Sequence, residues 1–228
     1  MNEKIFIQSK GPDSWKEFLA EPDKQWRTGY SAKSLAYCWE DKTGFPAEFK
    51  SAFDSAGLFL EMLFGIPEYK VFLDSKKAPS QNDLFVLCRD SEGSAVLMIE
   101  GKVSESFDKQ ISEWKTNDLS RRKRLDFLID KLEIDKAISD LDRYRYQLFH
   151  RTVSSILTAE EFKAKKALMI VHSFSKTNEW FCDYSDFVKL INPAINPQLN
   201  EIYHCKTLIS DIDLYIGWIK GDVKFLEK

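Results

Sequence analysis

Three short apolar runs in close succession constrain the fold of this chain more than any other feature. They lie in YKVFLDS (69–75), NDLFVLCRD (82–90) and SAVLMIEGKV (94–103), and the segments KKAPSQ and DSEG separate them. Short apolar runs bounded by turn-forming residues are typical of β-strands. The pattern therefore predicts an antiparallel meander of three strands.

A helical segment over about 140–163 separates this meander from a fourth apolar run, KALMIVHSF (166–174). The fourth run does not alternate between apolar and polar residues, which indicates a strand buried on both faces. A helix between two strands is typical of a crossover connection. We therefore expect an α/β fold, with a central mixed sheet built on the three-strand meander and flanked by helices.

Further elements are expected outside this core. Short strands are predicted at 4–8 and 214–222, and a charged helical layer at 107–139 with Asp118 and Ser120 as candidate caps. Helices are predicted to open near Gly11 and to cover 31–40, 45–56, 58–65 and 180–191. No repeat or linker divides the chain, so we expect one domain over 1–228, with its core at about 54–175, a helical N-terminal elaboration at 1–53 and a C-terminal helix and strand at 176–228.

Composition narrows the classes of function. The 228 residues carry a net charge of -3, which argues against a global basic surface of the kind that coats nucleic acid. Cys38, Cys88, Cys182 and Cys205 are scattered, so neither a disulfide framework nor a zinc site is indicated. The chain shows no signal peptide and no apolar stretch of the length needed to span a bilayer. We expect a cytoplasmic protein without a membrane partner.

Charged residues end the third apolar run, at Glu100-Gly101-Lys102. The string Glu-x-Lys occurs five times in the chain and is uninformative alone. If DSEG forms the hairpin turn, opposed residues have numbers that sum to about 183, which places Asp83 opposite Glu100. Two carboxylates attract Mg²⁺, and a neighbouring lysine can orient a water or stabilise negative charge on phosphorus. The alternative is a surface cluster of charges at the end of a hairpin.

This arrangement resembles the PD-(D/E)xK, or restriction-endonuclease-like, nuclease superfamily. The resemblance covers about residues 54–175: a helix, an Asp at the start of one strand, a hairpin, a strand that ends in Glu-x-Lys, and then a helix and another strand. It implies a Mg²⁺ (or Mn²⁺) site at Asp83, Glu100 and the intervening Gly101, with Lys102 beside the attacking water. It also implies a further acidic residue, Glu61 in LFLEMLF, and a catalytic Gln147 on the second core helix.

The chain departs from that family's pattern at two places. Asn82-Asp83 stands where the motif has Pro-Asp, and Arg151 stands where one branch of the family has Tyr in Gln-x-x-x-Tyr. The segments WRTGYSAKSLAYCWE and LMIVHSFS also resemble an uncharacterised bacterial family of hypothetical proteins, which implies no function.

The basic run Arg121–Arg124 is interpreted as a solvated helix start in preference to a phosphate clamp. His172-Ser173 is interpreted as the end of a strand, because no nucleophile elbow accompanies it. Arg143, Arg145 and Arg151, on the predicted second core helix, are candidates for phosphate contact, or for ordinary pairing with Asp140 and Asp142.

The sequence thus predicts a Mg²⁺-dependent nuclease whose substrate is nucleic acid, DNA rather than RNA, with a homodimer as a possible assembly. The alternative is a non-catalytic module of the same fold that binds nucleic acid or a protein.

Overall fold

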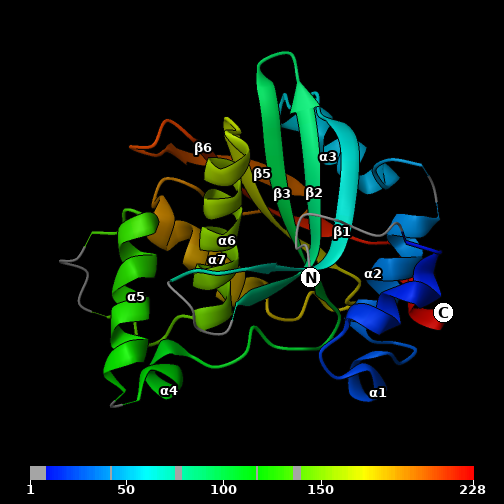
Figure 1. Ribbon diagram of the computed structural model, residues 1–228, viewed down its shortest axis with the longest axis horizontal. Coiled ribbons are helices and arrows are strands. Elements are labelled where there is room, and N and C mark those ends of the chain that lie inside the picture. Colours follow the sequence, from blue (N-terminus) through cyan, green and yellow to red (C-terminus); the bar gives the residue numbers. More distant parts are fainter. Residues whose placement is uncertain (1–8, 42, 75–78, 117, 136–139) are drawn as a thin grey trace, which may run out of the picture.

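A six-stranded mixed sheet forms the centre of the molecule. The computed structural model describes residues 9–41, 43–74, 79–116, 118–135 and 140–228. The strands are β1 (Glu61–Val71), β2 (Ser80–Asp90), β3 (Gly93–Lys102), β4 (Lys166–Ser173), β5 (Glu201–Thr207) and β6 (Asp213–Lys220). Their order is β1-β2-β3-β4-β6-β5, and Figure 1 shows β1, β2 and β3 side by side. The predicted meander, its crossover and the α/β class are confirmed.

Strand directions divide the sheet into three parts. β1, β2 and β3 pair antiparallel, β3, β4 and β6 pair parallel, and β5 returns antiparallel to β6. The hairpin register places Leu84 opposite Ile99, so the numbers of paired residues sum to 183 as predicted. Every residue of β4 is buried, in agreement with its unbroken apolar sequence.

Helices cover both faces of the sheet. The elements are η1 (Pro12–Phe18), α1 (Pro22–Gln25), α2 (Ser31–Glu40), α3 (Ala47–Ser55), α4 (Ile111–Lys115), α5 (Leu119–Lys131), α6 (Tyr146–Phe162), α7 (Phe181–Ile191) and η2 (Val223–Glu227). Phe149 of α6 and Phe187 of α7 enter the core of one face, whereas Trp39 of α2 and Phe49 of α3 enter the core of the other. Figure 1 shows α6 across the sheet, with α4 and α5 on one side of the molecule and α1 and α2 on the other.

Helix α6 makes the crossover from β3 to β4, and this connection decides what lies near the end of β3. Because β3 and β4 are parallel, the chain must return along the sheet before β4 begins. The first turn of α6 therefore lies beside the last residues of β3. Two segments 45 residues apart in the sequence, at Lys102 and Gln147, are brought into contact in this way.

The N-terminal boundary of α6 differs from the prediction. The expected helix at 140–163 begins only at Tyr146, because a turn precedes it over 141–144 and Arg145 pairs with Gln110 in an isolated β-bridge. Ile111 donates its backbone N–H to the carbonyl of Tyr144, and Tyr146 donates to Lys109. Arg143 and Arg145 therefore lie before the helix, in its entry segment.

The expected helix at 58–65 was wrong, because β1 begins at Glu61. A short apolar run does not distinguish a strand from a buried helix by its pattern alone, and here pairing with β2 decides the outcome. Strand β5 was not predicted, since its alternating sequence EIYHCKT is short and follows a turn-rich connector. The predicted layer at 107–139 contains two helices, α4 and α5, and Asp118 caps α5 as expected by accepting from Ser120 N. The strand predicted at 4–8 lies outside the described residues.

Candidate functional site

Glu100 and Lys102 form a buried ion pair at the end of β3. They are two residues apart on a strand, so their side chains project from the same face. The Lys102 Nζ lies 2.8 Å from Glu100 Oε1. Glu100 is 3% exposed and Lys102 is 4% exposed. The charges that follow the apolar run are thus enclosed by the fold and do not mark the point where β3 reaches water.

Lys102 has an acceptor for each of the three N–H groups of an ammonium. Besides Glu100, its Nζ donates to Gln147 Oε1 at 3.0 Å and to the backbone carbonyl of Ser106 at 3.3 Å. The ring of Phe107 lies 4.8 Å from Nζ and contributes a cation–π contact. The structure therefore places Gln147, which the family resemblance had named, in direct contact with Lys102.

Arg151 is the second cation beside Glu100. One helical turn after Gln147, its Nε donates to Glu100 Oε2 and its Nη1 donates to the Ser80 hydroxyl at 3.0 Å. Because a guanidinium only donates, the Ser80 proton is free to be donated to His150 Nδ1, 2.8 Å away. Burial, then the charge of Arg151, lowers the pKa of His150 well below its usual value. His150 is therefore neutral in this network.

Asp83 reaches β3 through the backbone. The ladder of β2 and β3 ends at Leu84 and Ile99, so Asp83 and Glu100 are the next opposed positions. The Asp83 Oδ2 accepts a hydrogen bond of 2.7 Å from Gly101 N. A Cβ added at Gly101 would lie 3.3 Å from the same oxygen, so glycine allows this close approach. The structure thus brings together Asp83, Glu100, Gly101 and Lys102.

Glu68 is a member of this site that the sequence prediction missed. On β1, Pro67 pairs with Leu84 and Tyr69 pairs with Asn82, so Glu68 lies opposite Asp83. Its φ of 54° departs from the extended conformation of a strand. Glu68, Asp83 and Glu100 therefore occupy consecutive positions in a row across three adjacent strands. The prediction of a helix at 58–65, and of a strand only from Tyr69, left Glu68 in the gap between them.

Electrostatic effects show that the three carboxyls influence one another. Burial, followed by the negative charges of Glu100 and Glu68, raises the pKa of Asp83 well above its usual value. Burial, reinforced by Glu100, also raises the pKa of Glu68 to about 7. Burial disfavours the charged form of Glu100 too, but Arg151 and Lys102 overcome it and lower the pKa of that carboxyl. The charge of Glu100 is compensated, whereas Asp83 and Glu68 resist ionisation.

Glu61 does not belong to this site, which corrects the prediction. It lies at the opposite end of β1, in register with Arg89, and forms an exposed ion pair of 2.7 Å with that residue. The reason is its secondary structure: Glu61 begins a strand that runs away from the hairpin turn, and Glu68 lies seven positions further along that strand. The acidic residue that the fold places beside Asp83 is Glu68.

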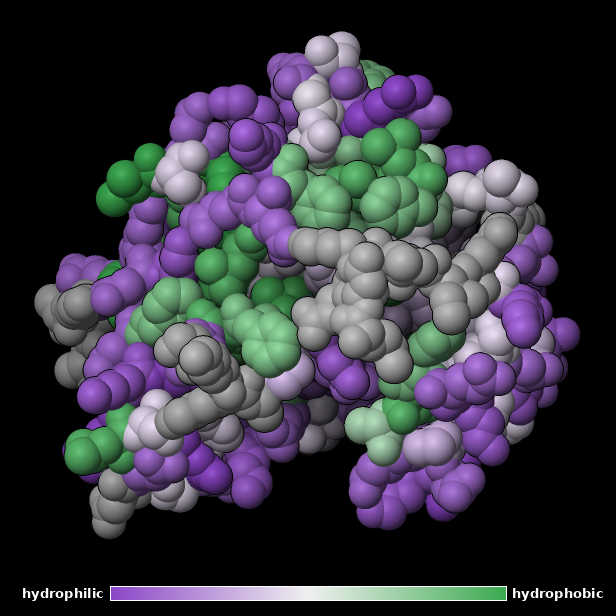
Figure 2. Space-filling view, viewed as in Figure 1, coloured by the Kyte–Doolittle hydropathy of each residue, from purple (hydrophilic) through white to green (hydrophobic). Residues whose placement is uncertain are grey.

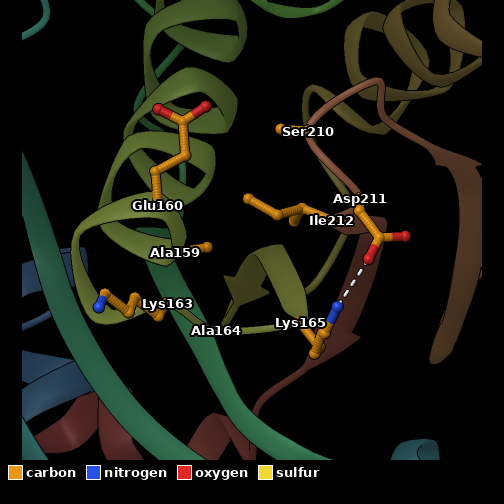
Figure 3. A pocket seen from close by; sticks show the side chains of 8 residues that line it. All are labelled: Ala159, Glu160, Lys163, Ala164, Lys165, Ser210, Asp211 and Ile212. Carbon is orange, nitrogen blue, oxygen red and sulfur yellow. Dashed lines mark hydrogen bonds and ion pairs between the residues drawn. The ribbon is translucent and has the colours of Figure 1, made fainter.

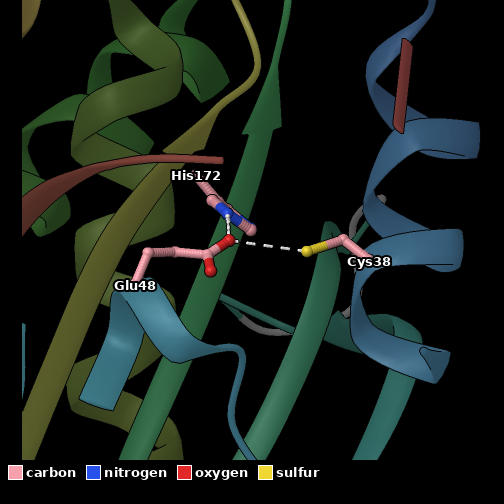
Figure 4. Close-up of side chains that lie close together, drawn as sticks. All are labelled: Cys38, Glu48 and His172. Carbon is pink, nitrogen blue, oxygen red and sulfur yellow. Dashed lines mark hydrogen bonds and ion pairs between the residues drawn. The ribbon is translucent and has the colours of Figure 1, made fainter. Parts of the chain in front are cut away.

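A second polar cluster consists of Cys38, Glu48 and His172, from α2, α3 and β4 (Figure 4). The Trp39 indole N–H donates to His172 Nδ1 at 3.2 Å. Nδ1 is therefore an acceptor, and the ring proton lies on Nε2, which donates to Glu48 Oε1 at 3.1 Å. A metal at Nε2 would require that proton to move to Nδ1, where the Trp39 donor opposes it.

The Cys38 thiol is also unsuited to metal binding, because burial raises its pKa. We therefore interpret the cluster as a polar contact that fixes α2 and α3 to the sheet. His172 behaves as the strand-end histidine that the sequence suggested.

A hollow of about 280 Å³ lies at the other end of α6 (Figure 3). Three of the four charged residues that line it are engaged in ion pairs: Lys165 contacts Asp211 at 2.6 Å, and Glu160 contacts Lys131 at 2.7 Å. Since α6 begins beside Glu100 and ends at this hollow, its length separates the hollow from the acidic row.

Among the described residues, no helix has both the length and the apolar composition that a membrane crossing requires.

A family model described as a domain of unknown function (DUF6946) matches residues 8–223, so the chain belongs to that family. Comparison with curated proteins and with solved structures finds no match.

Proposed function

We propose that this member of the DUF6946 family is a divalent-metal-dependent nuclease that hydrolyses phosphodiester bonds. One observation carries the proposal: Glu68, Asp83 and Glu100 form a row across three strands, beside the buried cations Lys102 and Arg151. Carboxylates that repel one another are relieved by a cation, and cationic side chains nearby suit an anionic substrate such as nucleic acid. DNA is the proposed substrate in preference to RNA.

The kinds of ligand present suit a hard divalent cation such as Mg²⁺ or Mn²⁺, although oxygens of Glu68, Asp83 and Glu100 do not all lie within 4.8 Å of one another. The donor set consists of carboxylate oxygens, which these ions prefer. Each oxygen of Glu100 accepts one hydrogen bond, from Lys102 or from Arg151, and a carboxylate oxygen has a second lone pair for a further ligand. Asp83 and Glu100 would hold the ion, with Glu68 as a third carboxylate. When bound, such an ion activates a water and neutralises charge on the phosphate.

Residues of the chain supply positive charge at the site and hold the charged groups in position. Lys102 is held by Gln147 and by the Ser106 carbonyl, so its ammonium is positioned without the help of substrate. A positioned ammonium stabilises negative charge that develops on a phosphate oxygen. Arg151 keeps Glu100 ionised, and Gln147 orients Lys102 from the first turn of α6.

A second candidate function is a non-catalytic module that binds nucleic acid or a protein partner. One observation favours it: Glu100 and Lys102 are almost completely enclosed and satisfy one another's hydrogen bonds. An ion network of this kind can serve the structure alone. Divalent-dependent turnover distinguishes the two functions.

The proposal is tested by incubating the purified protein with end-labelled DNA and RNA, with Mg²⁺, with Mn²⁺ or with EDTA. Cleavage is expected only with a divalent ion. Asp83→Asn and Lys102→Met are each expected to reduce the rate by about 100-fold or more. Calorimetric titration of Mn²⁺ is expected to show binding that weakens in Asp83→Asn and persists in Lys102→Met, because only Asp83 would contact the ion.

Glu61→Gln is the matched control, since Glu61 is a carboxylate on β1 that pairs with Arg89 away from the site. It should cleave like the wild type. Cleavage that survives in Asp83→Asn, or metal binding that is unchanged in that variant, would overturn the assignment. Nucleic-acid binding without turnover would instead support the non-catalytic module.

A further inference from the structure

The segment that follows β3 is held from both sides of the sheet. On the side of α2, Ser31 N donates to Glu105 Oε1 at 2.9 Å. On the side of α7, the Trp180 indole N–H donates to the Ser104 carbonyl at 2.9 Å. Residues within three positions of Lys102 thus connect the start of α2 with the start of α7. Both helices begin beside the candidate site.

Each of these helix starts carries an aromatic ring, Tyr30 before α2 and Trp180 before α7, on which an arginine packs. The Arg27 guanidinium carbon lies 6.0 Å from the centre of the Tyr30 ring, and that of Arg145 lies 5.1 Å from the Trp180 ring. Tyr30 is 41% exposed. Arg145 is fixed by Asp183, at 2.7 Å. The Arg145–Trp180 pair is therefore held in place, and the two pairs flank the exit of β3 on opposite faces of the sheet.

Space for a ligand exists beside the second pair. A hollow of about 200 Å³ lies before α6, lined by Gln110, Arg143, Tyr144, Arg145, Asp183 and Asp186. In Figure 2 the lower outline of the molecule is indented between the lobe that carries α1 and the lobe that carries α4. The surface is concave in the region where the chain leaves β3.

We infer that these two arginine–aromatic pairs bind single-stranded nucleic acid, with unpaired bases on Tyr30 and Trp180 and backbone phosphates at Arg27 and Arg145. The inference rests on the proposed function, whose substrate it specifies. An aromatic ring can receive the face of an unpaired base, whereas a duplex hides those faces in its stack. Arginine contributes both stacking and phosphate contact.

Charge also favours a single strand over a duplex. Duplex binding depends on many phosphate contacts, whereas the chain carries a net charge of -3. Two residues of the strongest basic run, at 121–124, already make contacts within the protein: Arg121 donates to the Trp114 carbonyl, and Arg124 forms an ion pair with Asp74. Stacking on aromatic rings needs fewer free cations.

The test is fluorescence anisotropy in EDTA with a labelled 20-nucleotide oligothymidine and with a duplex of the same length. The wild type is expected to bind the single strand more tightly. Tyr30→Ala should weaken that binding by about 5-fold or more, because one stacked base is lost, and Tyr30→Phe should restore it. Phe59→Ala is the control: Phe59 is 77% exposed and precedes β1, at the end of the strand away from the site, so its removal should change binding less than 2-fold.

The outcomes separate this inference from the proposed function. Tighter binding of the duplex, or binding of the single strand that Tyr30→Ala leaves unchanged, overturns the inference even if metal-dependent cleavage is observed. Single-strand binding that depends on Tyr30, without cleavage in Mg²⁺ or Mn²⁺, supports the binding surface and overturns the catalytic proposal. If neither nucleic acid is bound or cleaved, both fail.

Discussion

Replacing Glu100 by Gln tests the ion network at the end of β3 directly. The substitution keeps the shape of the side chain and removes its charge. Lys102 and Arg151, which are 4% and 8% exposed, then lose the anion that compensates them. Since a buried charge without a partner is costly, we expect a large destabilisation of the folded state.

The magnitude follows from the burial of the network. Removing one partner of a buried ion pair typically costs about 3 to 5 kcal/mol of unfolding free energy. For a chain of 228 residues, 1 kcal/mol lowers the melting temperature by roughly 2 to 4 °C. Glu100→Gln is therefore expected to lower it by roughly 6 to 20 °C in metal-free buffer.

The assay is thermal unfolding followed by circular dichroism in EDTA, with Glu61→Gln as control. Glu61 also pairs with an arginine, but the side chains of Glu61 and Arg89 are 63% and 59% exposed, so that change should cost less than about 1 kcal/mol. If Glu100→Gln melts within 2 °C of the control, the reasoning that Glu100 compensates two buried cations is refuted.

Three further predictions concern stability. The pKa of Glu68 in the folded protein is raised to about 7, so its protonated carboxyl stabilises the folded state at low pH, and this stabilisation is lost as the pH rises through 7. Between pH 5 and 8, the unfolding free energy measured in urea should therefore fall by about 2 to 3 kcal/mol more for the wild type than for Glu68→Gln. Equal falls for the two proteins would contradict this. Gly221→Ala should cost about 1 to 3 kcal/mol in urea unfolding, because its Cβ would overlap the ring of Phe174, and an unchanged midpoint would show that the ring moves freely. Glu48→Ala should cost about 1 to 3 kcal/mol by leaving His172 Nε2 without an acceptor, whereas Glu48→Gln keeps an acceptor oxygen and should cost less; equal losses would contradict the assigned tautomer.

The sequence was most informative where local pattern and pairing geometry agree. The turn DSEG gives the hairpin register through simple arithmetic, and the structure has Leu84 opposite Ile99 as that arithmetic requires. The unbroken apolar run of β4 correctly indicated burial on both faces. The contact between Lys102 and Gln147 joins residues that the family resemblance had named.

The sequence was least informative where a residue's role depends on which strand it joins. Glu61 and Glu68 lie seven residues apart in one apolar segment, and nothing local distinguishes them. Only pairing of β1 with β2 shows that Glu68 lies opposite Asp83 and that Glu61 lies opposite Arg89. Arg151 was a candidate for phosphate contact, and its pairing with Glu100 was not predicted for the same reason, since Glu100 is 51 residues away.

By itself, then, the sequence determined the α/β class, the meander and the pairing of Asp83 with Glu100, because alternation, turn residues and register are properties of neighbouring residues. Tertiary structure decided the burial of Glu100 and Lys102, the presence of Glu68 and Arg151 beside them, and the positions of Tyr30 and Trp180 at the exit of β3. These depend on how β1 pairs with β2 and on where α2, α6 and α7 pack, and both are decided by contacts between residues far apart in the chain.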